Sequence, residues 1–211
     1  MINAIKAATN FLADDHGNPV APHDPKKELT VLLIVPGSTE MDEQGRIKGS
    51  LDIPLSNVGE QQVEKTADEL KQFKIDLIYT SACQFSMQTA REIANGSIKV
   101  RVDENLENID HGLWHGKRVD ELKSKQPRVY RQWGEHPETV CPPSGETIES
   151  AEKRIQRFAK KLLRTHRKGV IGVVIAEPLA SLFRSELEST EIGNLWQAGK
   201  NCGNWKQIVF A

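Results

Sequence analysis

A continuous run of apolar and β-branched residues, from Leu29 to Val35, constrains the fold of this chain more than any other feature of its sequence. The run lacks the alternation of polar and apolar residues that is typical of a strand with one face in water. It therefore predicts a strand buried on both faces, as strands in parallel sheets normally are. Pro36 and Gly37 end the run, because proline and glycine favour turns.

Segments that favour strands and segments that favour helices alternate along the rest of the chain. Ser56 is expected to cap the first helix of this series, in which apolar residues recur at helical spacing as far as Phe73. The elements expected after it are a strand at Ile75–Thr80, a helix at Cys83–Ala94, a strand at Ile98–Val102, and a helical segment at Lys117–Trp133 broken by Pro127. They are followed by a long helix whose apolar stripe covers 148–163 and which ends in Arg164, Arg167 and Lys168, a strand at Val170–Ala176, a helix with Pro178 at its first position, and a strand at Gln207–Phe210. This order predicts an α/β fold of three layers, in which helices cover both faces of a mostly parallel sheet.

The length of the chain, 211 residues, is enough for one large core, and no linker-like stretch divides its middle. One domain is therefore expected, and we place it at residues 28–211. Residues 1–27 combine a candidate helix, Asn3–Ala13, with a stretch rich in turn-forming residues. We interpret them as an N-terminal extension.

The charged residues nearly cancel, with 28 lysines and arginines against 29 aspartates and glutamates, and the two signs are interspersed. This composition predicts no attraction to nucleic acid or to a membrane surface. Three cysteines without short metal-ligand spacing argue against a disulfide framework and against a zinc site. No apolar run approaches the roughly 20 residues that span a bilayer, and the first residues lack the pattern of a signal peptide. We expect a cytoplasmic protein without a cofactor or a bound metal.

Residues that follow the strands are the candidates for a functional site, because ligands of open α/β sheets bind at the carboxyl ends of the strands. Four segments meet this condition: 35–40, 80–83, 108–112 and 176–178. The first, second and fourth contain no histidine, arginine or lysine. Little positive charge is therefore expected at the centre of the site.

These segments belong to an ordered series of motifs. The series comprises Leu33–Glu40 with Gly45–Ser56, then Thr80-Ser81 with Gln88-Thr89-Ala90, then Asp110–Gly116, and finally Pro143–Thr147. In order and spacing, over roughly residues 29 to 183, the series resembles the signature motifs of the histidine phosphatase (phosphoglycerate mutase-like) superfamily. The resemblance implies a phosphoglycerate mutase-like fold for residues 28–211 and, for an active member, chemistry on phosphate esters.

In that family, a histidine at the end of the first strand attacks a phosphoryl group, two arginines and a second histidine hold the phosphate oxygens, and a carboxylic acid protonates the leaving alcohol. The resemblance places Pro36 at the nucleophile, Val35 and Phe85 at the two arginines, Ala176 at the second histidine and Asn108 at the acid. None of these side chains can perform the corresponding step, and the ring nitrogen of a proline is locked in a tertiary amide. The resemblance therefore implies a pseudoenzyme with no catalytic residue and with a binding, regulatory or structural role, whose partner is an unknown protein or a neutral small molecule.

Five further residues are expected to lie near this vestigial pocket: Gly37, Ser38, Arg46, His111 and Glu177. Glu177 precedes a helix where the family usually has glycine, and we hypothesise that its carboxylate lies over the helix start and repels phosphate. Arg46, like Lys48, keeps positive charge at the pocket's edge, although solvation at the surface explains both residues equally well.

Other interpretations of the same residues stay open. The alternative is a phosphomonoester phosphatase or mutase-like enzyme that uses a replaced catalytic residue or a metal ion, and His111, Cys83 and Ser81 are the nearby candidates for the residue. Gly37 and the residues after it could hold an anion through backbone amides, although turn formation is the preferred explanation. His111 and His115 lie four residues apart without a third ligand nearby, so structural roles are preferred to metal binding. Cys83 is expected to be a small buried residue rather than a nucleophile.

Overall fold

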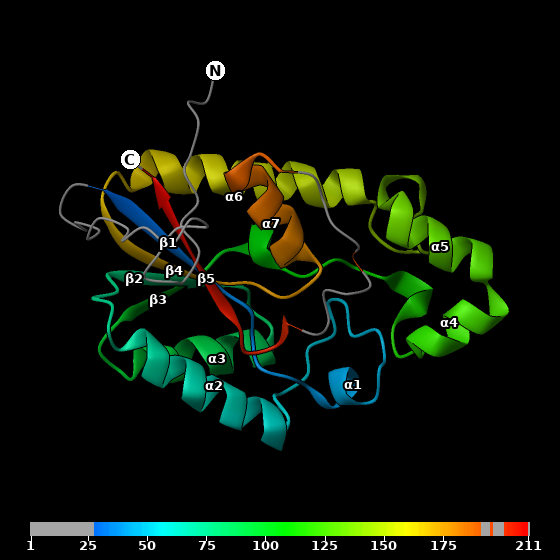
Figure 1. The fold of residues 1–211 in the computed structure, drawn as a ribbon, viewed down its shortest axis with the longest axis horizontal. Helices are drawn as coiled ribbons and strands as arrows, with labels where there is room; N and C mark the ends of the chain where they lie inside the picture. The colour runs from blue at the N-terminus through cyan, green and yellow to red at the C-terminus, as the bar shows by residue number, and fades with distance from the viewer. Residues whose placement is uncertain (1–27, 191–194, 196–200, 211) are drawn as a thin grey trace, which may run out of the picture.

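The computed structural model describes residues 28–190, 195 and 201–210. They form one five-stranded sheet in the order β3-β2-β4-β1-β5 (Figure 1). Its strands are β1 (Leu29–Ile34), β2 (Leu77–Thr80), β3 (Lys99–Val102), β4 (Gly169–Val174) and β5 (Trp205–Phe210). The three pairings among β1 to β4 are parallel, whereas β5 pairs with β1 in antiparallel orientation. The expectation of a mostly parallel sheet is confirmed.

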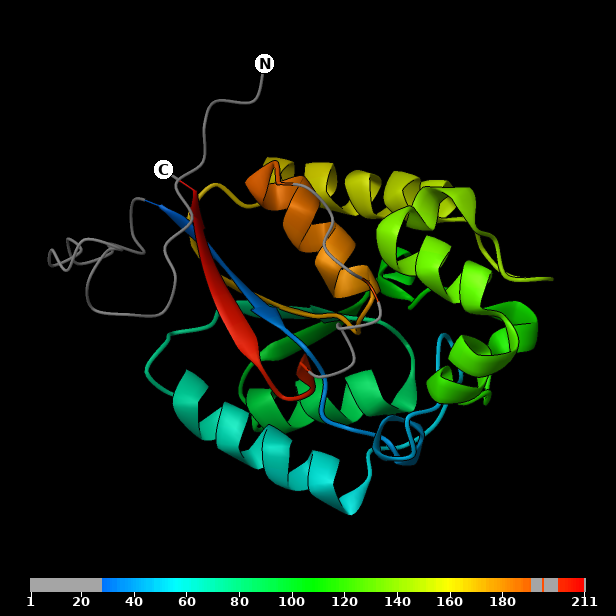
Figure 2. The same cartoon turned by 45° about the vertical axis from the view of Figure 1, so that its right-hand side comes forward.

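Helices cover both faces of the sheet, as the views in Figures 1 and 2 show. One face carries α2 (Asn57–Leu70) and α3 (Gln84–Ala94), and the other carries α6 (Ile148–Thr165) and α7 (Leu179–Glu188). Three shorter helices, α1 (Glu40–Glu43), α4 (Val119–Lys125) and α5 (Pro127–Glu135), lie beyond the ends of the strands. Single turns of 3-10 helix occur at Glu104–Leu106, Gly112–Trp114 and Pro137–Thr139. The expected three-layer α/β architecture is confirmed.

The burial of β1 follows from this layering. Val31 and Leu33 pack into the apolar core beneath α6 and α7, whereas Leu32 and Ile34 pack into the core beneath α2 and α3. Successive side chains of a strand point to opposite faces, so a strand between two helical layers needs apolar residues at every position. This is the physical reason for the unbroken apolar run.

The local signals at helix ends mostly hold. The Ser56 hydroxyl accepts a hydrogen bond from the Gly59 amide at the start of α2, as expected of an N-cap. Pro127 is the first residue of α5 and separates it from α4, because a proline has no N–H to continue a helix. The prediction for Pro178 is wrong by one position: it is the N-cap of α7, and the helix begins at Leu179.

Close packing joins the loop after β1 to the start of α2. A Cβ at Gly59 would lie 2.0 Å from the carbonyl oxygen of Ser38, and a Cβ at Gly37 would lie 2.4 Å from the carbonyl oxygen of Gly59. Both glycines are needed because two backbone segments meet there. The loop that carries the candidate site is therefore held firmly against a helix.

The candidate helix Asn3–Ala13 and the rest of the proposed extension lie outside the described residues. Within the described part of the chain, no helix combines the length and the apolar character needed to cross a membrane. Trp114 and Trp133 are buried, and Trp205 is half-buried.

Candidate functional site at the carboxyl ends of the strands

Three strands end at one level of the sheet. Ile34 of β1 is the register partner of Val174 of β4, which in turn is the partner of Thr80 of β2. The residues that follow these strand ends therefore emerge side by side, as parallel strands require. The structure brings the segments that begin at Val35 and Ser81 together with the segment that includes Ala176.

An apolar cluster lies at this edge. The side chains of Cys83, Phe85 and Ala176 pack together, with Ile53 and Leu55 against them. Phe85 is 0 % exposed, and its backbone amide donates a hydrogen bond to the carbonyl of Ile53, 3.0 Å away. A ring buried in this way brings no positive charge to the site.

The backbone amides of the loop after β1 already have acceptors. The Gly37 amide donates to the Thr89 hydroxyl (3.4 Å), and the Ser38 amide donates to Oε1 of Gln62 (2.9 Å). The next amide, of Thr39, donates to Oδ2 of Asp42 at 2.8 Å. An anion would have to displace these internal partners, so turn formation explains the glycine-serine segment better than an anion cradle does.

Pro36 and Val35 are fixed from the same direction. The Val35 amide donates to the carbonyl of Asn204, and the Pro36 carbonyl accepts from the Gly203 amide, at 2.9 and 3.0 Å. Both residues are buried. The loop before β5 therefore holds the end of β1 in place.

Lys48 belongs to the site, and the interpretation of this residue as a solvated surface cation is wrong. Only 8 % of its surface is exposed, and its Nζ lies 4.8 Å from the centre of the Phe85 ring. The same Nζ donates to Oδ2 of Asp42 at 2.7 Å. A cation over an aromatic face is stabilised by the ring quadrupole, and the carboxylate neutralises its charge. Lys48 is thus a buried, neutralised cation rather than a free phosphate ligand.

Arg46 points elsewhere. Its Nη1 donates to the carbonyl of Gly116 at 2.6 Å, and its Nε donates to Oε1 of Gln44. The backbone of Arg46 also forms an isolated bridge with Arg118, just before α4. These described contacts join Arg46 to its own loop and to the segment before α4, and none of them joins it to the strand ends.

Asn108 ties two segments together at the same edge. Its Nδ2 donates to the carbonyl of Gly49 at 3.0 Å and to the carbonyl of Glu177 at 2.9 Å. The residue is 3 % exposed, and its Oδ1 has no hydrogen-bond partner among the described residues. The amide therefore acts as a cross-link between the loop that follows α1 and the turn that follows β4.

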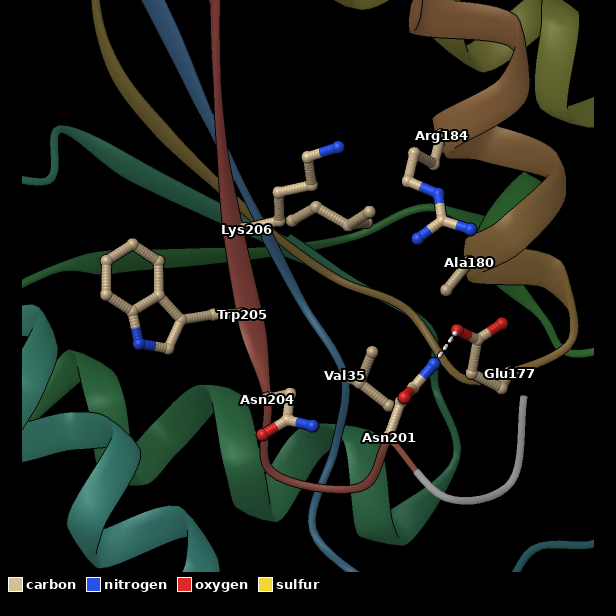
Figure 3. A pocket seen from close by; sticks show the side chains of 9 residues that line it. Val35, Glu177, Ala180, Arg184, Asn201, Asn204, Trp205 and Lys206 are labelled. Carbon is tan, nitrogen blue, oxygen red and sulfur yellow. Dashed lines mark hydrogen bonds between the residues drawn. The ribbon is translucent and has the colours of Figure 1, made fainter. Parts of the chain in front are cut away.

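The Glu177 carboxylate caps α7. Its Oε2 accepts hydrogen bonds from the backbone amide and the hydroxyl of Ser181, at 3.0 and 2.8 Å. Its Oε1 accepts from Nδ2 of Asn201 at 3.2 Å, the dashed line in Figure 3. The expectation that this carboxylate lies over the helix start is confirmed. A negative group at a helix N-terminus is stabilised by the unsatisfied amides and by the helix dipole.

Cys83 and His111 are both buried, and their pKa values move away from those of reactive groups. Burial raises the pKa of the Cys83 thiol to about 12, helped by Glu107, whose Oε2 accepts from the Cys83 Sγ at 3.0 Å. Burial lowers the pKa of His111 to about 4, although its Nδ1–H donates to the carbonyl of Ile109 at 2.9 Å. Cys83 is therefore a protonated thiol at neutral pH, and His111 is a neutral imidazole.

The two histidines near this edge are joined by a hydrogen bond. The His111 backbone amide donates to Nε2 of His115 at 3.2 Å. A Cβ at Gly49 would lie 2.4 Å from the same Nε2, so the glycine lets the loop pass close to both rings. Within residues 28–190, 195 and 201–210, no three histidine, cysteine or acidic side chains are grouped so as to hold a metal ion.

Sequence reasoning missed the Lys48–Asp42 pair and the part played by Asn201. Lys48 stands between glycine-containing turns in a polar loop, and no periodicity marks it as buried. Asn201 follows a segment without strand or helix signals, and its link to Glu177 joins residues 24 positions apart. Such contacts depend on the path of the loops, which local patterns do not encode.

Comparison with known proteins assigns the family. The profile of the histidine phosphatase superfamily (branch 1) matches residues 31–210. Phosphoserine phosphatase 1 of Hydrogenobacter thermophilus is 30% identical over 184 residues, which cover 86% of each chain. A solved phosphoserine phosphatase from Entamoeba histolytica in complex with 3-phosphoglyceric acid superposes with a TM-score of 0.70 at 25% identity, over 87% of this chain and 90% of that one. A solved α-ribazole-5'-P phosphatase, described as putative, from Escherichia coli gives a TM-score of 0.74 at 22% identity, over 87% and 91% of the two chains. The profile match and the likeness over almost the whole domain together establish that this chain belongs to branch 1 of the histidine phosphatase superfamily.

Proposed function

We propose that this chain is a non-catalytic member of its superfamily, a pseudoenzyme with a binding, regulatory or structural role. The observation that carries the proposal is the buried Pro36 directly after β1, where the family resemblance expects the nucleophilic histidine. Its nitrogen is part of a tertiary amide, and its ring carries no group that could accept a phosphoryl group.

The surroundings of Pro36 support the same conclusion. Phosphoryl transfer depends almost wholly on positioning and on stabilisation of the phosphate charge. A hydrogen bond to a charged group is worth about 1.5 to 3 kcal/mol, so several missing ligands weaken phosphate binding by several powers of ten. Phe85 and Ala176 supply apolar surface instead, and the one described cation beside them, Lys48, is already paired with Asp42.

Recruited catalysts are disfavoured by their chemistry. A thiol with a pKa of about 12 is almost entirely protonated at neutral pH, and the thiolate is the nucleophile. Cys83 therefore lacks the activation that catalysis requires. With a pKa of about 4, His111 is suited to general base catalysis only at acidic pH, and its Nδ1–H already donates to the Ile109 carbonyl. Ser81 is buried.

The proposed partner of the strand-end pocket is a protein or a neutral small molecule. Apolar groups such as Phe85 and Ala176 favour uncharged ligand surface, and the carboxylate of Glu177 disfavours a doubly charged phosphate group. We place the protein in the cytoplasm because all three of its cysteines are free, which is typical of a reducing compartment.

The first experiment is an assay against a broad panel of phosphomonoesters, with and without divalent metal ions. The proposal expects no turnover above the uncatalysed rate. Turnover that disappears in His111→Ala or Cys83→Ala would refute the proposal and identify the replacement catalyst. Preparations of both variants made in parallel control for contaminating phosphatases, because a contaminant would be unaffected by either substitution.

Restoration of the missing residues is the second experiment. The variant combines Val35→Arg, Pro36→His, Phe85→Arg, Asn108→Glu and Ala176→His, and Glu177→Gly removes the carboxylate that caps α7. A folded variant is expected to show weak phosphatase activity and covalent labelling at position 36 by phosphate donors. The matched control keeps Pro36 and carries the other changes. A folded variant that is never labelled would show that these positions do not converge on one site.

A further inference from the structure

A cavity lies between α7 and β5, on the side of the sheet that faces α6 and α7 (Figure 3). Its volume is about 160 Å³, and Leu33 and Val35 of the β1 segment supply part of its apolar wall. Ala180 and Arg184 line it from successive turns of α7, and Lys206 lines it from β5. At about 30 Å³ for each water molecule, the space corresponds to roughly five waters, enough for a small organic ligand.

The cations of this cavity are not equivalent. Lys206 forms an ion pair with Glu188 at the far end of α7. Arg184, which is half-buried, makes no hydrogen bond and no ion pair in the described part of the chain. Figure 3 shows both side chains projecting into the same space, one from the helix and one from the strand. Among the described residues, Arg184 is therefore a positive charge without a counter-ion.

The negative group at the base of the cavity is already satisfied. Glu177 accepts from Ser181 with one oxygen and from Asn201 with the other. Both oxygens of Glu177 are thus engaged by the start of α7 and by Asn201, and no described contact joins this carboxylate to Arg184. It also makes the base of the cavity unfavourable for a ligand with two or more negative charges.

We infer that this cavity binds a short-chain monocarboxylate. A guanidinium group presents a planar fork of N–H donors that matches a carboxylate, and such charge-assisted bonds are strong. The carboxylate would lie on Arg184, and the short aliphatic part would lie against Leu33, Val35 and Ala180. Phosphate monoesters fit less well, because Glu177 repels their doubly charged head group more strongly than the single charge of a carboxylate.

This cavity shares Val35 and Glu177 with the vestigial pocket, but Phe85 and Ala176 do not line it, and the binding of a carboxylate requires no catalytic residue. The test described next contains no phosphate ester. A failure of carboxylate binding would therefore leave the proposed loss of phosphatase activity untouched, and turnover of a phosphate ester would leave carboxylate binding untouched.

The test is an NMR titration of the ¹⁵N-labelled full chain with butyrate, and with butyramide as the uncharged analogue of the same shape. We expect saturable shifts of the amides of Ala180, Arg184 and Lys206 with butyrate, at a roughly millimolar dissociation constant for a ligand of about six non-hydrogen atoms. Butyramide is expected to bind at least tenfold more weakly.

Two variants complete the test. Arg184→Gln is expected to weaken butyrate binding at least tenfold, while Arg167→Gln, which removes the same charge from an exposed arginine after α6, leaves it unchanged. Equal binding of butyrate by Arg184→Gln and the natural chain would overturn the inference. So would equal binding of butyramide, shifts confined to residues away from α7 and β5, or no saturable shift.

Discussion

The side chain of Asn108 provides the sharpest test of how the site is built. In Asn108→Asp, a carboxylate of the same shape replaces the amide, and the two N–H donors are lost. The carbonyls of Gly49 and Glu177, which now accept from Nδ2 at 3.0 and 2.9 Å, would then face a charged oxygen in a nearly closed environment.

The expected loss can be worked from these two bonds. A buried polar group left without its partner costs about 1 to 3 kcal/mol, so two carbonyls give a loss of about 2 to 6 kcal/mol in the free energy of unfolding at neutral pH. Domains of this kind are stable by only about 5 to 15 kcal/mol. Asn108→Asp is therefore expected to lose a large part of the stability of the fold.

The loss should depend on pH in a definite direction. Burial and the two carbonyls disfavour the charged form, so the pKa of an aspartate at position 108 is expected above its unfolded value of about 3.9. The native state then binds a proton more tightly than the unfolded state does. The variant is most stable below about pH 4 relative to the natural chain, and it loses stability as the pH rises through the folded pKa.

Urea denaturation at pH 4 and pH 7.5 measures this effect. Asn108→Leu separates the lost hydrogen bonds from the added charge, and its deficit should not change with pH beyond that of the natural chain. Asn57→Asp, at the exposed first residue of α2, is the matched control and should be neutral or slightly stabilising. A free energy of unfolding for Asn108→Asp within about 0.5 kcal/mol of the natural chain at pH 7.5, a typical value for neutral surface changes, would refute the cross-link.

Two further predictions follow from the buried groups near the strand ends. The pKa of His111 is about 4 in the folded chain, against an ordinary value of 6.5, so the unfolded chain takes up the proton at a higher pH than the folded chain does. The free energy of unfolding should therefore fall by about 3 kcal/mol as the pH drops from 6.5 toward 4. His111→Asn should abolish that part of the pH dependence in urea titrations, and an unchanged profile would contradict the assignment. The Cys83 thiol, with a pKa of about 12, should react with iodoacetamide at pH 8 at least 100-fold more slowly than the exposed Cys141. Mass spectrometry of peptides measures both rates, and equal labelling of the two cysteines in urea is the control. Comparable rates in the native protein would show that Cys83 is accessible.

The fold is largely readable from local patterns because each element carries its own reason. The run that forms β1 is apolar throughout since both of its faces are covered, and the apolar stripe of α6 matches its buried residues, from Ile148 to Leu162. The orientation of β5 could not be read in this way. Trp205–Phe210 pairs with β1 in antiparallel orientation, and a strand pattern does not record the direction of its neighbour.

The candidate site was likewise predictable only in part. The positions after the strands could be found because the carboxyl ends of parallel strands share an edge, and the burial of Cys83 was expected from its lack of a basic partner. The burial of Lys48 could not be predicted, since a lysine in a polar loop is normally solvated and only the path of the folded loop places it over Phe85. Arg46, two residues earlier, instead donates to the carbonyl of Gly116, so the composition of the loop alone does not predict where each cation lies.

The capping of α7 has a consequence for the chain as a whole. Because Glu177 accepts a hydrogen bond from the Ser181 amide in the first turn of α7, the chain itself supplies a negative group where a dissolved anion could otherwise bind. A protein that binds an ion only in its native state gains stability as the concentration of that ion rises. This chain carries the charge in its own sequence, so we expect the stability of α7 not to depend on the concentration of inorganic phosphate around the protein.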